Sequence, residues 1–253
     1  SVGRNVEQLL GVTRLTAATA ERLRTAAPIA WVRQGMPPFL MVHGTEDKGV
    51  PFSQSVEMCA AMRRLTNACE VYEMKGAPHG MDHWEPDPSL HHYKKKVVEW
   101  VLAASRAHAA AVTAPKFQFR GTMTDVEFAR PVGVSLKFDA YVPPGPGPHP
   151  AVVIVHGGGL TRGDKRMFVT PLFEPLAKAG IAWFSIDYRL APQHKFPAAM
   201  NDVRAGVEYV RKHARELRVD PERIGMIAES AGGYVGAYVA ARHGAELGLK
   251  TVV

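Results

Sequence analysis

The sequence contains little cysteine and lacks long apolar runs. Cys59 and Cys69 are its two cysteines, too few for a disulfide framework or a cysteine-ligated zinc site. The predicted fold brings them near each other, and either one disulfide or two buried thiols fits the pattern. The longest apolar stretch, residues 151–155, is far shorter than the roughly 18 residues that a membrane-spanning helix requires. The sequence therefore predicts neither a disulfide-based scaffold nor a membrane span.

Basic residues exceed acidic residues, but they are not gathered in one place. The net charge is +7, and no nucleic-acid-binding motif accompanies the basic side chains. The densest group, Lys94–Lys96, lies beside apolar residues in a helical pattern, which indicates a solvent-facing helix surface. The sequence begins without the basic and apolar stretches of a signal peptide. We expect no nucleic-acid partner and leave the cellular compartment open.

Short apolar runs alternate with helical patterns over most of the chain. Strands are predicted at residues 38–42, 70–74, 151–155, 181–186 and 223–227, and several of these are short apolar runs. Helices are predicted at residues 52–65, 91–104, 168–178, 198–217 and 232–243. Val56, Cys59, Ala60 and the stem of Arg63 are expected on one face of the first helix. Fully apolar strands alternating with helices predict an α/β fold with a mostly parallel, doubly wound sheet.

The remaining segments complete this pattern. Residues 1–35 are weakly helical and long enough only for a small cap. Residues 103–116 are rich in alanine and end near a proline, which predicts a frayed helix end and a linker. Residues 116–127 and 134–142 alternate as antiparallel strands do, and residues 249–253 begin a further strand.

Ser230 follows a predicted buried strand and precedes a predicted helix. The segment 228–232, Ala-Glu-Ser-Ala-Gly, has the spacing of a G-x-S-x-G nucleophile elbow, with Ala228 at the first small position. Small residues are needed on both sides because the serine backbone is strained while its hydroxyl is exposed. For this motif alone, a plain helix start is the alternative.

A glycine-rich loop, His156-Gly157-Gly158-Gly159, directly follows the strand 151–155. A glycine turn after a buried strand exposes backbone N–H groups, and such a loop completes the oxyanion hole of esterases. Glycine turns also bind phosphate, but neither of the common phosphate-loop motifs is present. The two segments together favour nucleophilic catalysis by Ser230.

A serine nucleophile needs a base and an acid that orients the base. The stretch after Gly233 offers neither, whereas Glu46 and Asp47 follow the strand 38–42 and His79 follows the strand 70–74. Catalytic groups of open parallel sheets gather at the carboxyl ends of the strands. The spacing of His79, Asp82 and His83 is loosely metal-like, but we interpret these residues as a loop.

Taken together, these motifs resemble the α/β-hydrolase superfamily, in particular the hormone-sensitive-lipase-like esterases and their acetylxylan- and feruloyl-esterase-like relatives. The segments 156–159, 187–192, 196–199, 220–225 and 229–233 match the first half of that family's pattern. The segments 43–44, 47–51 and 76–80 match its second half. The resemblance covers residues 36–253 and implies a single α/β-hydrolase domain with a sheet of about eight strands.

The order of the two halves departs from the family. The family's C-terminal half corresponds to residues 1–102 and its N-terminal half to residues 117–253, with residues 103–116 as the junction. This order indicates a circular permutation, or a fragment cut from two tandem hydrolase domains. We expect the site to be completed within one chain, and a domain-swapped homodimer is the alternative.

The resemblance implies the role of each residue at the site. Ser230 corresponds to the nucleophile, His79 to the general base and acid, and Asp47 to the orienting acid, with Glu46 as the alternative acid. Glu229 is expected to point away from Ser230. The family's oxyanion donors correspond to the N–H groups of Gly158, Gly159 and Ala231. Structural roles are expected for Asp187, Arg189, Asp202, His43 and His156.

The activity that the resemblance implies is that of a serine carboxylesterase acting on small, short-chain acyl esters. Acetyl or feruloyl esters of plant polysaccharide are the candidate substrates. No cofactor and no metal is implied. Two other readings remain: a non-catalytic binding protein with a hydrolase fold, and a prolyl-oligopeptidase-like peptidase.

Overall fold

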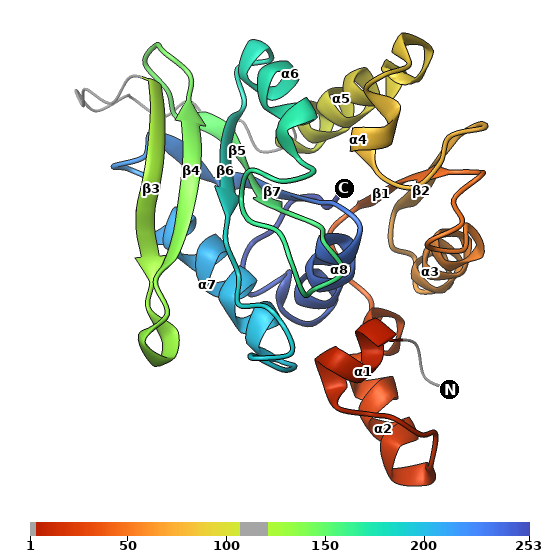
Figure 1. Ribbon diagram of the computed structural model, residues 1–253. Coiled ribbons are helices and arrows are strands. Elements are labelled where there is room, and N and C mark those ends of the chain that lie inside the picture. Colours follow the sequence, from red (N-terminus) through yellow and green to blue (C-terminus); the bar gives the residue numbers. More distant parts are fainter. Residues whose placement is uncertain (1–3, 107–120) are drawn as a thin grey trace.

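The computed structural model describes residues 4–106 and 121–253, and it has helices on both faces of a central sheet (Figure 1). The helices are α1 (Arg4–Leu10), α2 (Ala17–Ala26), α3 (Ser53–Arg64), α4 (Met81–Trp84), α5 (His92–Arg106), α6 (Phe173–Lys178), α7 (Ala198–Lys212) and α8 (Ala231–His243). The strands are β1 (Phe39–Gly44), β2 (Cys69–Met74), β3 (Gly121–Ala129), β4 (Leu136–Val142), β5 (His149–Val155), β6 (Ala182–Ile186) and β7 (Val219–Ala228). Short 3₁₀ helices are η1 (Pro28–Trp31), η2 (Pro88–Leu90), η3 (Pro131–Gly133) and η4 (Thr170–Leu172). None of the described helices is both long and apolar enough to cross a membrane.

The strands form a mixed sheet that the last residues of the chain hold together. Five strands pair in the order β3-β4-β6-β5-β7, and β1 pairs with β2. The pairs β3–β4 and β4–β6 are antiparallel, and the pairs β5–β6, β5–β7 and β1–β2 are parallel. Val252 bridges Met226 of β7 and Phe39 of β1 in parallel register. The predicted strand at the chain end and the predicted α/β architecture are therefore confirmed.

Alternating side chains of the central strands supply two separate cores. Val153 and Met226 belong to the core that includes residues of α3, α7 and α8. Val152 and Ile154 belong to the core that includes residues of α5 and α6. Successive strand residues point to opposite faces, so apolar residues at every position bury both faces. Continuous apolar runs such as residues 151–155 are the result.

Three predicted helices differ in detail from the structure. Of the predicted helix 168–178, only Phe173–Lys178 form α6, after the 3₁₀ helix η4. The buried face of α3 is formed by Met58, Cys59, Ala61 and Met62. Val56 is 46% exposed, so it does not share the buried face of Cys59 as predicted: α3 is rotated so that the Met58 and Met62 side chains, one turn apart, face the core. The predicted helix 198–217 ends as α7 at Lys212, and turns at residues 213–218 lead the chain into β7.

Only the first residues of the predicted junction lie in the described part of the chain. Residues 103–106 belong to α5, and residues 107–116 of the predicted linker lie outside the described residues. The strands that the junction would connect, β2 and β3, lie at opposite edges of the sheet. Helix α5 contacts β1, β7 and α6, so it already leads the chain from the β2 edge back across one face.

The N-terminal helices are attached to α8, which begins at the proposed nucleophile. The Tyr234 hydroxyl of α8 donates a hydrogen bond to the Ala26 carbonyl oxygen (2.9 Å). Trp31 contacts the ring of Tyr238 edge-on, and the Arg242 guanidinium lies 4.4 Å from the centre of the Trp31 ring. Leu9, Leu10, Val12 and Ala26 belong to the core that also includes residues of α8, so residues 4–35 pack onto that side of the molecule.

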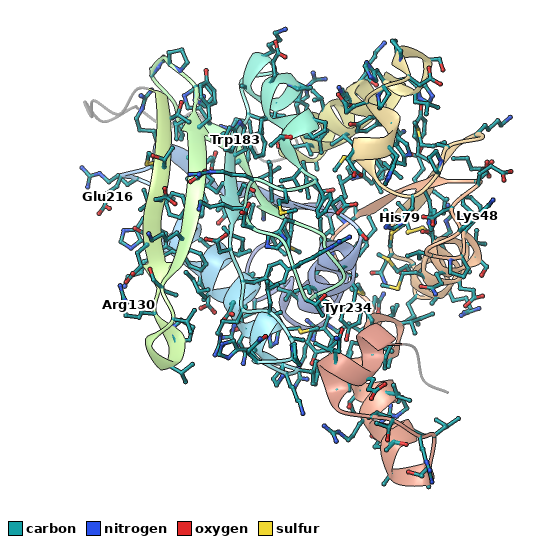
Figure 2. All side chains as sticks on the ribbon, viewed as in Figure 1. Lys48, His79, Arg130, Trp183, Glu216 and Tyr234 are labelled. Carbon is teal, nitrogen blue, oxygen red and sulfur yellow. A yellow bond between two sulfur atoms is a disulfide. The ribbon has the colours of Figure 1, made fainter. Side chains whose placement is uncertain are left out.

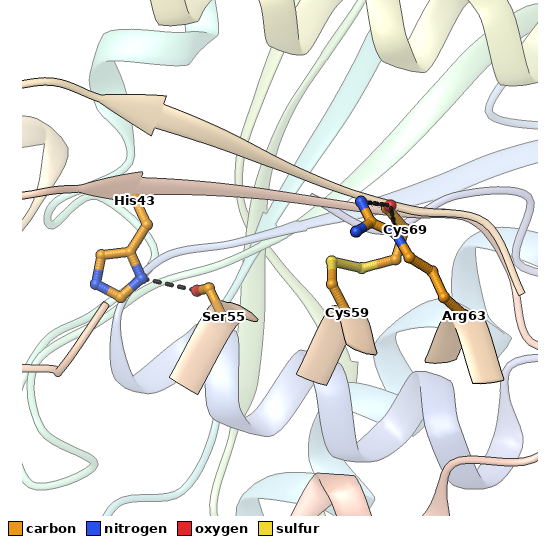
Figure 3. Close-up of a disulfide and its surroundings, with 5 residues drawn as sticks. All are labelled: His43, Ser55, Cys59, Arg63 and Cys69. Carbon is orange, nitrogen blue, oxygen red and sulfur yellow. Dashed lines mark hydrogen bonds between the residues drawn. A yellow bond between two sulfur atoms is a disulfide. The ribbon is translucent and has the colours of Figure 1, made fainter. Parts of the chain in front are cut away.

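A disulfide joins Cys59 of α3 to Cys69 of β2 (Figure 3), which decides between the two predicted states of the cysteines. The Arg63 side chain donates to the Cys69 carbonyl oxygen from both Nε (2.9 Å) and Nη2 (2.6 Å). The end of α3 is therefore fixed to the start of β2 by one covalent bond and two hydrogen bonds.

Removing this disulfide is expected to lower stability without changing the site. The bond closes a loop between residues 10 positions apart, for which loop entropy predicts about 3 kcal/mol. We expect the Cys59→Ala, Cys69→Ala variant to unfold at a lower urea midpoint than the wild type, measured by circular dichroism under non-reducing conditions. An unchanged midpoint would show that the bond is not formed in the folded protein.

Candidate active site

Ser230 lies at a sharp turn between β7 and α8. Its φ of 50° and ψ of −116° place it in a strained conformation that most residues avoid. Ala228 occupies the first small position of the elbow, and its Cβ faces Gly236 of α8. A Cβ added at Gly236 would lie 2.9 Å from the Ala228 Cβ. A side chain at residue 236 would collide with this methyl group, so alanine is tolerated at residue 228 by virtue of the glycine in α8.

Three predicted site residues form one hydrogen-bonded chain. His79 Nε2 lies 2.7 Å from Ser230 Oγ, and His79 Nδ1 lies 2.6 Å from Asp47 Oδ2. Asp47 follows β1, His79 follows β2 and Ser230 follows β7, so all three come from the carboxyl ends of strands in the same chain. Figure 2 shows His79 and Lys48, the neighbour of Asp47, on the side of the molecule where β1 and β2 lie. Both distances therefore join residues of one chain.

Asp47 is held as a carboxylate. The Asp47 side chain is 4% exposed, and the N–H groups of Gly49 and Val50 donate to Oδ1 at 2.7 and 2.8 Å. Burial by itself would raise the pKa of Asp47, but the Val50 N–H, the His79 ring and the Gly49 N–H outweigh it and hold the pKa below its usual value. Glu46, the alternative acid, is exposed, and the contact to His79 is made by Asp47.

His43 supports this acid from the other side. Its Nε2 lies 3.2 Å from Asp47 Oδ2 and 3.1 Å from the Val50 carbonyl oxygen, while Nδ1 lies 2.7 Å from Ser55 Oγ (Figure 3). Both neighbours of Nε2 are acceptors, so Nε2 carries the proton and Nδ1 accepts from the Ser55 hydroxyl. His43 thus has the structural role that the sequence predicts. Ser55 gave no sequence signal because it lies on α3, outside every motif.

The glycine loop and the start of α8 present free N–H groups. Gly158 and Gly159 have φ values of 106° and 66°, which a glycine adopts readily. Among the described residues, the N–H groups of Gly158, Gly159 and Ala231 donate to no backbone acceptor. The N–H of Ala231 is unpaired because helix α8 begins there. Unpaired N–H groups beside a serine hydroxyl can bind an anionic oxygen.

His156 and Tyr188 fix the start of the glycine loop. Their rings are stacked with centroids 4.3 Å apart, and the Tyr188 hydroxyl donates to the His156 carbonyl oxygen (2.9 Å). His156 Nδ1 lies 2.7 Å from the Gly157 carbonyl oxygen, so this nitrogen carries the proton. Burial lowers the pKa of His156, which keeps the ring neutral. Tyr188 was not predicted as part of the site, although it lies within the segment 187–192.

The remaining polar residues have the structural roles that the sequence predicts. The Arg189 guanidinium donates to both carboxylate oxygens of Asp202, at 2.7 Å from Nη2 and 2.8 Å from Nε. Asp187 accepts from the Lys165 N–H (3.0 Å). Within the described residues, no group of three histidine, cysteine, aspartate or glutamate side chains could hold a metal ion. The sheet order, the elbow and the hydrogen-bonded chain together define an α/β-hydrolase.

Comparison with known proteins gives the family. The family model described as BD-FAE matches residues 2–62 and 138–250, which is more than half of the chain. The chain belongs to the BD-FAE family.

Curated relatives are named as ester hydrolases. The carboxylic ester hydrolase LipN of Mycobacterium tuberculosis is 37% identical over 141 residues, which are 54% of this chain and 37% of LipN. The ethyl acetate hydrolase of Pseudomonas putida is 27% identical over 135 residues, 52% of this chain and 42% of that protein. The chain thus spans less than half the length of either relative.

Among solved structures, the carboxylesterase EstE1, cloned from a metagenomic library, is 30% identical. The alignment covers 65% of this chain and 52% of EstE1, with a TM-score of 0.45.

Proposed function

We propose that this chain carries a serine carboxylesterase site for short-chain acyl esters, with Ser230 as nucleophile, His79 as general base and acid, and Asp47 as orienting acid. The observation that carries the proposal is the continuous hydrogen-bonded chain from Ser230 Oγ through both nitrogens of His79 to Asp47. Activation of a serine hydroxyl requires this arrangement: a base in contact with Oγ and an acid that orients the base.

The reaction follows from these contacts. His79 Nε2 takes the proton of Ser230 as Oγ attacks the ester carbonyl carbon, and the N–H groups of Gly158, Gly159 and Ala231 stabilise the negative oxygen. His79 then protonates the departing alcohol, which leaves an acyl group on Ser230. Water, activated by His79, attacks the acyl-enzyme and releases the acid. Asp47 remains ionised throughout and stabilises the positive charge that forms on His79.

The substrate class is inferred from the names of the relatives. The name of the Pseudomonas putida relative, ethyl acetate hydrolase, supports a small acyl group. Acetyl esters, and feruloyl esters of plant polysaccharide, are the substrates we propose to examine first. The mechanism requires no cofactor.

The proposed domain organisation is one permuted hydrolase unit. Residues 1–102 supply the acid and the base, and residues 117–253 supply the nucleophile and the glycine loop. Support comes from β1, the chain end at Val252 and β7, which pair as neighbours in one sheet. We propose that a single chain forms the complete site.

A fluorophosphonate probe tests the proposal directly. We expect one covalent adduct per chain by intact mass, mapped to Ser230, together with turnover of p-nitrophenyl acetate. The same enzyme should hydrolyse the corresponding p-nitroanilide far more slowly; comparable rates would favour a peptidase. A folded protein with neither adduct nor turnover would overturn the esterase proposal and leave a binding role.

A further inference from the structure

Glu229 is a buried acid next to Ser230 that the proposed mechanism does not use. The residue is 7% exposed, and its Oε2 is enclosed without a hydrogen-bond partner among the described residues. An ionised carboxylate in this position would lose its hydration without gaining a donor, which is costly. A neutral carboxylic acid greatly lowers this cost, because it carries no charge to solvate.

The carboxyl group of Glu229 lies between the two loops that carry the site. A Cβ at Gly157 would overlap Glu229 Oε2 and would lie 3.1 Å from the Ser230 Cβ, so the carboxyl group packs directly on the glycine loop. A Cβ at Gly80, in the turn after His79, would lie 3.4 Å from Glu229 Oε1. One oxygen therefore faces the loop of the candidate oxyanion donors, and the other faces the turn of the base. The expectation that Glu229 simply points away from the site is incomplete.

The charges around this carboxyl group favour its neutral form. Burial, and then the nearby charge of Asp82, raises the pKa of Glu229 to about 8. Tyr188, on the segment beside the glycine loop, has a pKa raised by burial and by Glu229. His156 remains neutral, as described above. The other titratable groups that face this region are His79 and His83 of the same turn as Asp82.

We propose that Glu229 is a positioning residue that acts as a neutral carboxylic acid, and that its ionisation at alkaline pH inactivates the site. In the neutral form it fills the space between the glycine loop and the His79 turn and keeps them at the spacing that the reaction needs. In the ionised form it places an uncompensated negative charge beside the N–H groups that must stabilise an anionic oxygen. This inference rests on the proposed esterase function.

Two substitutions separate the roles of shape and charge. We expect Glu229→Ala to lower the kcat for p-nitrophenyl acetate at pH 7 at least tenfold with a smaller change in KM, because the two loops lose their spacer. Glu229→Gln should rescue most of this loss, since its amide has nearly the same shape.

The pH profile tests the role of charge. Above about pH 8, the wild-type kcat should fall toward tenfold per pH unit, whereas Glu229→Gln should show no such decline. Glu73→Gln, which changes an exposed carboxylate at the end of β2, is the control and should keep the wild-type profile.

A second measurement does not depend on activity. A carboxyl group with a raised pKa in the folded state stabilises the protein fully below its unfolded pKa and loses this contribution as the pH rises through the folded pKa. As the pH rises from about 4.5 to about 8, the melting temperature of Glu229→Gln should therefore increase relative to that of the wild type. Glu73→Gln should show no such trend.

The outcomes distinguish this inference from the proposed function. An equal alkaline decline in the wild type and Glu229→Gln, or a pH-independent melting difference, would overturn the role of Glu229 even if the chain is an active esterase. Equal activity of Glu229→Ala and Glu229→Gln would overturn its role as a spacer. A pH-dependent melting difference in a chain without any turnover or probe adduct would overturn the esterase proposal, and the positioning role with it, but not the neutral state of the buried acid.

Discussion

Ser230→Ala is expected to reduce the turnover of p-nitrophenyl acetate by about 10⁵-fold and to abolish the fluorophosphonate adduct. Ser230 Oγ is the atom that would form the bond to the acyl carbon. Within the described residues, no second hydroxyl contacts His79 Nε2. Removing one oxygen leaves the binding site and the N–H groups in place. The substrate KM should therefore change much less than kcat.

Two further measurements complete the test: the fold of Ser230→Ala, and the activity of the double variant Ser230→Ala, His79→Ala. Ser230 occupies a strained backbone position at φ 50°, which alanine must also adopt, so circular dichroism should show an unchanged fold. His79→Ala should be nearly as inactive as Ser230→Ala, and the combination should be no worse than either, because the two residues act as a unit. Additive losses in the double variant would show that Ser230 and His79 do not act together.

Asp47→Asn is expected to reduce kcat by about 10⁴-fold, the order found for this change in other Ser-His-Asp sites. Asp47 Oδ2 accepts from His79 Nδ1 and leaves Nε2 free to take the serine proton. An asparagine amide in the same place can donate to Nδ1, which puts the ring proton on Nε2 and removes the base. Glu46→Gln, an exposed carboxylate one residue away, should retain activity within about threefold. A large loss in Glu46→Gln with a small one in Asp47→Asn would reverse the assignment of the acid.

Asp47→Asn should also change how the stability of the folded protein depends on pH in the acid range. The pKa of Asp47 is lowered in the folded protein, so its ionised form stabilises the fold above the usual carboxyl pKa of about 4 and this contribution is lost as the pH falls below it. Asp47→Asn should therefore show a weaker dependence of its melting temperature on pH in the acid range than the wild type. Thermal melts from pH 3 to pH 6 would measure this difference.

The strands and the elements of the site were largely predictable because they depend on local patterns. Continuous apolar runs predict strands buried on both faces, and the structure places residues 151–155 in β5, between two cores. Ser230 and the glycine loop could be identified because strand-turn-helix geometry requires small residues at fixed positions. The rule that catalytic groups lie at the carboxyl ends of strands indicated Glu46, Asp47 and His79, and the resemblance to the esterase family favoured Asp47 as the acid.

Contacts between distant segments could not be predicted in the same way. Periodicity did not place the buried face of α3, since Val56 satisfies the helical spacing but α3 is rotated to bury Met58 and Met62. The pairing of Ser55 with His43 and the stacking of Tyr188 on His156 join residues 12 and 32 positions apart. These contacts depend on how α3 packs and how the glycine loop turns, which residue type and spacing alone do not specify.

The sequence by itself determined the class of the fold, the nucleophile candidate and the kind of residues that would accompany it. Only the tertiary structure decided that His79, 151 positions from Ser230, meets it at hydrogen-bond distance within one chain. The physical reason is the sheet: the last residues of the chain pair with both β7 and β1 and so align the carboxyl ends of strands from the two halves. The packing of those same loops also encloses Glu229, whose neutral state depends on burial that no local sequence pattern encodes.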